Sequence, residues 1–198
     1  MRHLKKVTLI TLATVALTAM AGVSGASATE LEIGGVGTTA KVKIKLSLEP
    51  GTSLMWSSTT GELSNECGTS NIEGETEGGN GTRVGGPISS LTFENCAEEP
   101  VVVDTNGRLE IAHIPGTTNG TVFSVGTKVT VPSRFGGTLT CTTASGEGTD
   151  IGTLTGKGKG GGNATMDINA TLNCGFFLPS ASWRGSYLVT SPTELGVN

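Results

Sequence analysis

The sequence predicts an all-β, antiparallel fold, either a β-sandwich or jelly-roll-like, held by two disulfides. Glycine occurs 31 times in 198 residues and threonine is as frequent. Threonine is β-branched and suits a pleated surface, and glycine supplies the turns between short strands. Beyond the first 28 residues, the strong helix formers gather into no stretch with a 3.6-residue period. Four cysteines bracket two glycine-rich segments, 67–96 and 141–174.

Strand signals recur about every ten residues, a spacing typical of a β-sandwich or a β-barrel rather than of βαβ units. The clearest is residues 41–48, where lysines and serine alternate with aliphatic residues, so the lysines face water and the aliphatic side chains face the core. Nine to twelve strands are expected in all. The others are predicted at residues 88–94, 101–104, 108–111, 121–125, 128–131, 138–143, 151–155, 164–172 and 183–190.

A tight hairpin is predicted between strands 101–104 and 108–111. The pair Asn106-Gly107 lies between them, and both residues tolerate positive φ, which two-residue hairpin turns require.

The first 28 residues are predicted to be a removed signal peptide. Arg2, Lys5 and Lys6 precede an uncharged run over 7–23, and small residues ending at Ala28 provide a cleavage site. The run is too short for a comfortable membrane span, so no transmembrane segment is expected in the mature chain. Residues 29–198 would then form one β-sandwich domain, which could also be divided into two packed halves, about 29–115 and 116–198.

Charge narrows the class of partner. Removal of residues 1–28 leaves ten basic and seventeen acidic residues. This balance argues against nucleic acid and anionic lipid as partners. The sequence does not identify the partner; cell-wall or extracellular polysaccharide and protein are the candidates. Eight of the acids lie within forty residues that contain only Arg83 as a counter-charge: Glu62, Glu66, Glu73, Glu75, Glu77, Glu94, Glu98 and Glu99.

The cysteines are expected to pair as Cys67 with Cys96 and Cys141 with Cys174, because each pair encloses a compact, turn-rich segment. Closing each loop of about thirty residues would stabilise the fold by roughly 3 to 4 kcal/mol in the chain-entropy model. Metal and redox sites are disfavoured, since no C-x-x-C motif occurs and His113 is the one histidine beyond the signal. No cofactor is predicted.

Several of these segments carry a family resemblance. Residues 139–143, 148–156, 164–168 and 183–192 resemble uncharacterised secreted proteins of actinobacteria, which also share an Ile-Ser-Ser-Leu-Thr-Phe-x-Asn-Cys element at the place of residues 88–96. The resemblance spans most of residues 60–195 and implies an exported β-rich protein without an assigned activity. A fainter likeness, confined to the order of cysteine, glycine-rich turn, apolar strand and cysteine, is to secreted proteins named as activators of alkane oxidation.

The sequence contains no recognisable catalytic motif. His113 lies on a strand with Leu109 and Ile111 on the same face, which predicts a partly buried structural histidine. Glu73, Glu75 and Glu77 alternate as paired glycosidase carboxylates do, but glycine and threonine surround them, which favours a solvated acidic face.

The expected function is that of a secreted, non-enzymatic structural or binding protein of the extracellular space or cell envelope. A carbohydrate-binding module that uses Trp56 as a stacking platform is one alternative. A glycoside hydrolase that uses carboxylates, with Asp104, Asp150 or the glutamates as candidates, is the other. Trp56, Glu73, Glu75 and Glu77 are therefore the speculative ligand-facing residues.

Overall fold

The computed structural model describes residues 28–58, 64–98, 100–132, 137–175 and 180–198. Within these ranges the protein contains fifteen β-strands and no helix, and hence no helix that could span a membrane. The strands are β1 (Leu31–Ile33), β2 (Val36–Thr38), β3 (Lys43–Leu48), β4 (Leu54–Ser58), β5 (Ser64–Glu75), β6 (Val84–Cys96), β7 (Val102–Thr105), β8 (Arg108–His113), β9 (Gly120–Val125), β10 (Lys128–Pro132), β11 (Thr138–Thr142), β12 (Thr149–Thr155), β13 (Thr165–Asn173), β14 (Ser180–Ser191) and β15 (Leu195–Val197).

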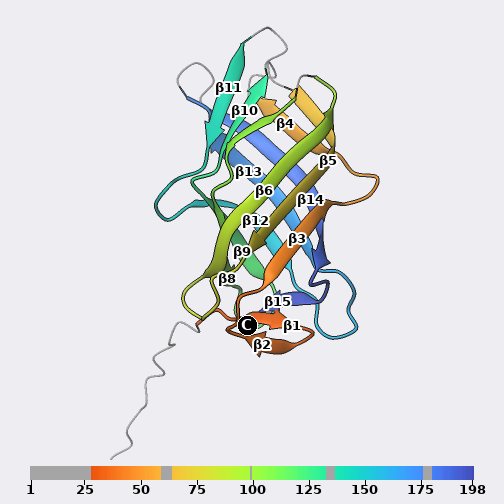
Figure 1. The fold of residues 1–198 in the computed structure, drawn as a ribbon, viewed down its shortest axis with the longest axis vertical. Helices are drawn as coiled ribbons and strands as arrows, with labels where there is room; N and C mark the ends of the chain where they lie inside the picture. Colours follow the sequence, from red (N-terminus) through yellow and green to blue (C-terminus); the bar gives the residue numbers. More distant parts are fainter. Residues whose placement is uncertain (1–27, 59–63, 99, 133–136, 176–179) are drawn as a thin grey trace, which may run out of the picture.

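Strands β3 to β14 form one antiparallel sheet that closes into a barrel with eight strand positions (Figure 1). Closure is made by β14, which pairs with β13 on one side and with β3 and β4 on the other. The order around the barrel follows the order in the chain, so the topology is up-and-down. The prediction of an all-β antiparallel fold with two disulfides is confirmed. The sheet closes on itself, however, where two packed sheets were expected.

Four strand positions are each occupied by two strands in succession. β3 and β4 both pair with β14 and β5, and residues 49–53 separate them. In the same way β7 and β8 follow one another, as do β9 and β10, and β11 and β12. Eight long positions are thereby built from twelve strands.

The predicted hairpin at Asn106-Gly107 is wrong. β7 and β8 do not pair with each other; β7 pairs with β10, whereas β8 pairs with β6 and β9. Gly107 does have a positive φ of 70°. This conformation bends one continuing strand rather than reversing it, and the Gly107 carbonyl accepts a hydrogen bond from the Ile88 amide of β6.

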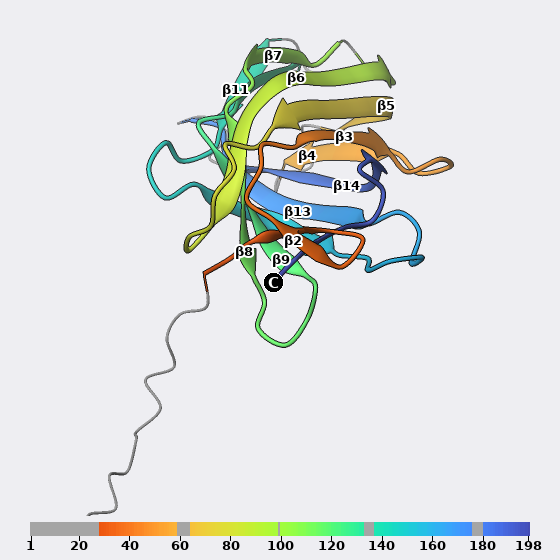
Figure 2. The same cartoon turned by 60° about the horizontal axis from the view of Figure 1, so that its bottom comes forward.

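A small second sheet, in the order β15-β1-β2, covers one end of the barrel (Figures 1 and 2). Leu31 of β1 is opposite Val197 of β15, so the beginning and the end of the described chain are joined. We call β1, β2 and β15 the cap. The predicted strand list contained neither these strands nor β4 and β5.

Side chains alternate between the barrel interior and the solvent, as β13 shows. Its even-numbered residues from Met166 to Leu172 are buried and its odd-numbered residues from Asp167 to Asn173 are exposed. Farther from the cap, Trp56 and Trp183 stack with ring centroids 5.5 Å apart, and Phe93 packs edge-on against both. The interior is therefore an aromatic and aliphatic core.

The remaining strand predictions correspond to observed strands. Each predicted range beyond residue 88 overlaps one of β6 to β14, with ends that differ by a few residues. The predicted signal peptide at residues 1–28 lies outside the described residues, except for Ala28 at its end.

Candidate functional site

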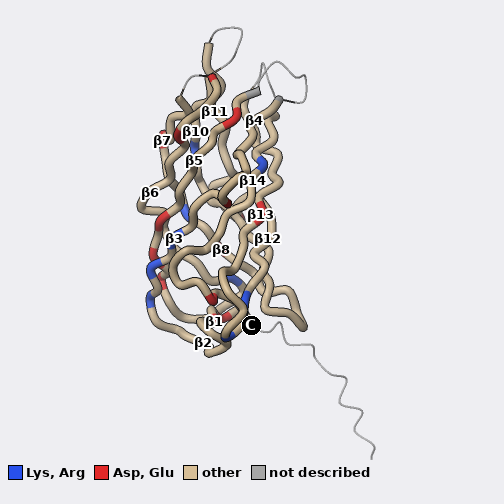
Figure 3. The backbone as a smooth tube through the Cα atoms, turned by 90° about the vertical axis from the view of Figure 1, so that its right-hand side faces the viewer, with Lys and Arg blue, Asp and Glu red and all other residues tan. Residues whose placement is uncertain are grey.

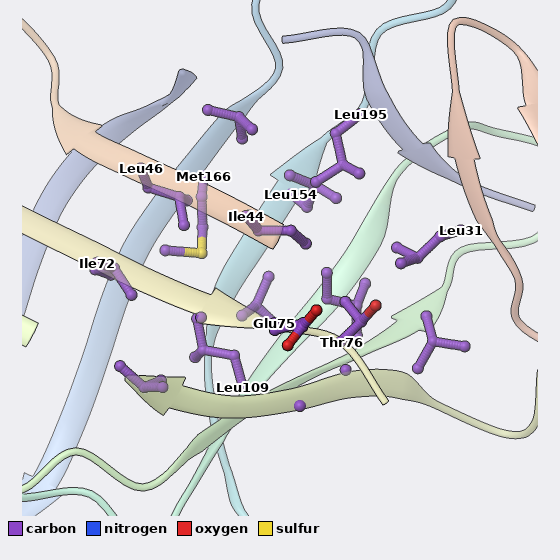
Figure 4. Close-up of a pocket in the computed structure, with 18 of the residues that line it drawn as sticks. Leu31, Ile44, Leu46, Ile72, Glu75, Thr76, Leu109, Leu154, Met166 and Leu195 are labelled. Carbon is purple, nitrogen blue, oxygen red and sulfur yellow. The ribbon is translucent and has the colours of Figure 1, made fainter. Parts of the chain in front are cut away.

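An apolar cavity lies inside the capped half of the barrel (Figure 4). Nearly every strand position contributes a side chain to it, and the cap contributes Leu31 and Leu195. Its apolar lining consists of Leu31, Ile44, Leu46, Ile72, Val84, Pro87, Ile88, Leu109, Ile111, Val122, Leu154, Met166, Val189 and Leu195.

The cavity has a volume of about 50 Å³. Protein interiors hold few voids larger than a water molecule, and an unfilled cavity costs about 24 cal/mol per Å³. The void therefore costs roughly 1 kcal/mol of stability. Its apolar walls offer water few hydrogen-bond partners, so the chemistry of the site is that of an apolar ligand.

Met166 is the most adaptable group in the cavity wall. Its side chain is 2% exposed and lies near Leu46 (Figure 4). Methionine is unbranched with three rotatable bonds, so it can rearrange around an occupant at lower cost than leucine or valine.

A polar pair lies on β5 and β14, farther from the cap than Ile72 and Val189 of the cavity wall. The Tyr187 hydroxyl is 2.8 Å from Ser70 Oγ, which donates to the Thr92 carbonyl at 2.8 Å. Burial raises the pKa of the Tyr187 phenol above its ordinary value of 10.0, and the hydrogen bond with Ser70 opposes this change. Tyr187 therefore stays protonated at neutral pH.

Both disulfides form as predicted. Cys67 bonds to Cys96 across β5 and β6, and Cys141 of β11 bonds to Cys174 just after β13. Cys96 lies directly opposite Cys67 in the continuous register of β5 and β6, and Asn95 beside it has a left-handed φ of 53°. Disulfides persist in oxidising compartments, so two of them suggest an extracytoplasmic protein.

The three alternating glutamates do not converge on one site. Glu73 forms an ion pair with Lys45 of β3 at 2.8 Å, and Glu77 pairs with Arg108 of β8 at 2.8 Å. Glu75 is exposed and is the one glutamate of the three that borders the interior cavity (Figure 4). Basic and acidic positions are interspersed on the barrel wall (Figure 3). The hydrogen bond with Glu77 is the largest cause that raises the pKa of Arg108. The local arrangement is an ion-paired, solvated surface.

Trp56 does not face the solvent. Its side chain is 0% exposed inside the barrel, stacked on Trp183, which is 3% exposed. A sugar ring can stack only on an accessible aromatic face, so Trp56 in this position does not provide the platform that carbohydrate binding would need.

The other candidate residues lie apart from one another, and each forms a hydrogen bond with a nearby group. His113 is partly buried, as predicted, and its Nε2 is 2.8 Å from the Thr117 carbonyl oxygen. Asp104 accepts a hydrogen bond from Thr130 on β10, and Asp150 accepts one from the Gly152 amide. Within the described ranges, no three histidine, cysteine or carboxylate side chains gather closely enough to hold a metal ion.

Sequence reasoning missed the cavity, because its wall is assembled from residues spread between Leu31 and Leu195. Alternating apolar residues in 41–48 and 164–172 indicated which side chains point inward. No local pattern shows that those faces surround a common space, or that strands from both ends of the described chain form the cap that covers it.

Comparison of the chain with family models, with curated protein sequences and with solved structures found no significant match. Assignment of a function therefore rests on the residues and geometry described above.

Proposed function

We propose that the protein is an exported, non-enzymatic binding protein that holds a small apolar molecule inside its barrel. The observation that carries this proposal is the apolar cavity of about 50 Å³ in the capped half. Eight-stranded barrels have interiors that side chains can just fill. Here Val84, Val122 and Val189 line the cavity, and a larger side chain at these positions would occupy the space. The choice of valine in the sequence therefore leaves the cavity unfilled.

The size of the cavity limits the ligand. Engineered apolar cavities of roughly 150 Å³ bind benzene. The present space is smaller, so a xenon atom or a very short hydrocarbon should enter directly. Benzene should require Met166 to move.

Export is supported by the charged and apolar pattern of the first 28 residues and by the two disulfides. The resemblance to secreted actinobacterial proteins agrees with this reading. Cleavage near Ala28 and release outside the cell are parts of the proposal.

The two methionines of the mature chain allow a direct test. Residues 29–198 contain only Met55, which is 41% exposed, and Met166, which lines the cavity. With ¹³C-labelled methionine methyl groups, xenon under pressure should shift the Met166 signal in a saturable way and leave the Met55 signal in place.

A pair of matched variants locates the effect. Val122→Leu fills the cavity and should abolish the xenon shift of Met166, while raising Tm by filling the void. Val131→Leu changes a buried interior valine that does not line the cavity and should retain the shift. An unmoved Met166 signal in the native protein, or an equal shift in Val122→Leu, would contradict the proposal.

The two alternative functions have less support. Trp56 is buried, and neither the cavity nor the outer groove described below is lined by Asp104 or Asp150. Glu73 and Glu77 are paired with cations from different strands. No comparable observation favours a hydrolase or a carbohydrate module built on these residues.

A further inference from the structure

A groove of about 560 Å³ lies on the outer wall of the barrel, over β4, β13 and β14. It forms where residues 49–53 leave the wall between β3 and β4. This loop is anchored by the Glu49 amide, which donates to the Ser186 carbonyl at 2.8 Å, and by Thr52, which donates to the Glu49 carbonyl. The volume is within the range of small-molecule sites.

The groove contains an unpaired cation. Arg184 is exposed on β14, and its guanidinium forms no ion pair with any residue that the structure describes. By contrast, Arg83, Arg108 and Lys45 all have carboxylate partners. Arg184 is thus available to a carboxylate, which guanidinium binds through two parallel hydrogen bonds.

Neutral polar groups surround this cation. Asn169 is directly opposite Arg184 on β13, and Thr52, Ser53 and Ser186 also line the groove. An amide and several hydroxyls can exchange hydrogen bonds with the hydroxyl groups of a ligand. The lining itself includes no carboxylate, but Asp167 of β13 lies at the edge of the groove and accepts a hydrogen bond from the Ser186 hydroxyl at 2.6 Å.

Met55 adds an apolar face. It is directly opposite Arg184 on β4, on the side away from Asn169, and is one of the few large apolar side chains that are substantially exposed. A thioether side chain can pack against the C–H face of a pyranose ring while the ring hydroxyls point to the polar groups.

We propose that this groove binds a carboxylated sugar, with Arg184 on the carboxylate, Asn169 and the loop hydroxyls on the ring hydroxyls, and Met55 against the ring. This site is separate from the interior cavity. It needs neither a buried aromatic platform nor any of the glutamates.

The test uses the mature protein with three probes: sodium glucuronate, glucose and sodium acetate. Glucuronate should shift the methyl signal of Met55, and the amides of Asn169 and Arg184, and leave the Met166 methyl in place. Its half-saturating concentration should be at least about tenfold below those of glucose and acetate, because only glucuronate makes both sets of contacts.

Variants separate the site from nonspecific charge effects. Arg184→Gln should weaken glucuronate binding about tenfold or more, because a hydrogen-bonded ion pair is lost. Lys128→Gln, which removes an exposed cation on β10, should leave the affinity unchanged.

Three results would overturn the proposal: no shift at Met55 and Arg184 with glucuronate, equal saturation by acetate, or unaltered affinity in Arg184→Gln. Equal saturation by acetate would mean that the groove attracts anions without recognising a sugar. Because Met55 reports the groove and Met166 reports the cavity, either proposal can fail while the other stands.

Discussion

At the scale of single residues, the partners of the charged side chains come from distant parts of the chain. The sequence shows a run of glutamates with Arg83 as the only nearby cation. In the folded protein Lys45 of β3 pairs with Glu73, and Arg108 of β8 pairs with Glu77. These pairs could not be predicted, because they depend on strand register. Their energies are small, about 0 to 1 kcal/mol each for exposed pairs.

Tyr187 yields a prediction on pH dependence. It is the only tyrosine in the chain, and burial raises the pKa of its phenol. A raised pKa in the folded state contributes stability that is fully present below the unfolded value of about 10 and is lost as the pH rises above it. Absorbance at 295 nm should therefore show no phenolate in the folded protein at pH 10.5, and phenolate should appear together with alkaline unfolding.

Tyr187→Phe is the matched variant for this titration. Above pH 10, the urea midpoint of this variant should fall less steeply with pH than that of the native protein. At neutral pH, its free energy of unfolding should be about 1 kcal/mol lower, because the hydrogen bond to Ser70 is lost. A gradual phenolate transition near pH 10 with the fold intact would show that the phenol is accessible to solvent.

At the scale of the strand, local pattern located most strands but not their partners. Residues 101–104 and 108–111 are strands, as predicted, yet Asn106-Gly107 bends a continuing strand. The positive φ that the dipeptide allows serves either a turn or a bend. Pairing with β6 and β10 decides between the two, and that information lies in other parts of the sequence. β5 was missed because its polar and glycine residues lack apolar alternation.

The two disulfides should differ in their local effects. Cys67–Cys96 joins strands that are also held by a ladder extending to Gly74 and Ile88. Cys141–Cys174 joins β11 to the end of β13, where Thr142 and Asn173 form the single paired position between those strands. The loops are of similar length, 29 and 33 residues, so loss of either disulfide should reduce global stability by a similar amount, roughly 3 to 4 kcal/mol.

Amide hydrogen exchange can detect the difference. In Cys141→Ala/Cys174→Ala, exchange should accelerate in β10 and β11, since little else fastens them to β13. In Cys67→Ala/Cys96→Ala, amides along β5 and β6 should remain protected relative to global unfolding. If amide exchange accelerated equally in β5 and β6 and in β10 and β11, the strand ladders would not determine local opening.

At the scale of the whole molecule, the sequence predicted antiparallel strands with alternating buried and exposed residues, but not that the sheet closes into a barrel. A sandwich and a barrel use the same in-and-out alternation, so periodicity cannot separate them. Barrel closure depends on β14 meeting β3, as in the pair of Val189 with Leu46. These residues are far apart in the chain, and neither carries a local sign of the other.

The cap should contribute measurably to stability. Leu195 is 1% exposed and lines the cavity, so Leu195→Ala should lower the free energy of unfolding by about 2 to 5 kcal/mol. Val36→Ala in β2 is the control, since Val36 is 69% exposed and its loss should change stability by no more than about 0.5 kcal/mol. Urea denaturation midpoints compare the two; similar values would mean that the cap is only loosely attached.

The pairing of Leu31 with Val197 also sets an order of assembly. Contacts between chain ends form late, because the entropy of closing so long a loop must be overcome before they bring any gain. In the export that we propose, the N-terminus would cross the membrane first, so β1 would emerge before β15. Until β15 has emerged, the cap cannot form and the end of the barrel stays uncovered. Under the proposed function, the apolar molecule would be taken up before the cap is in place.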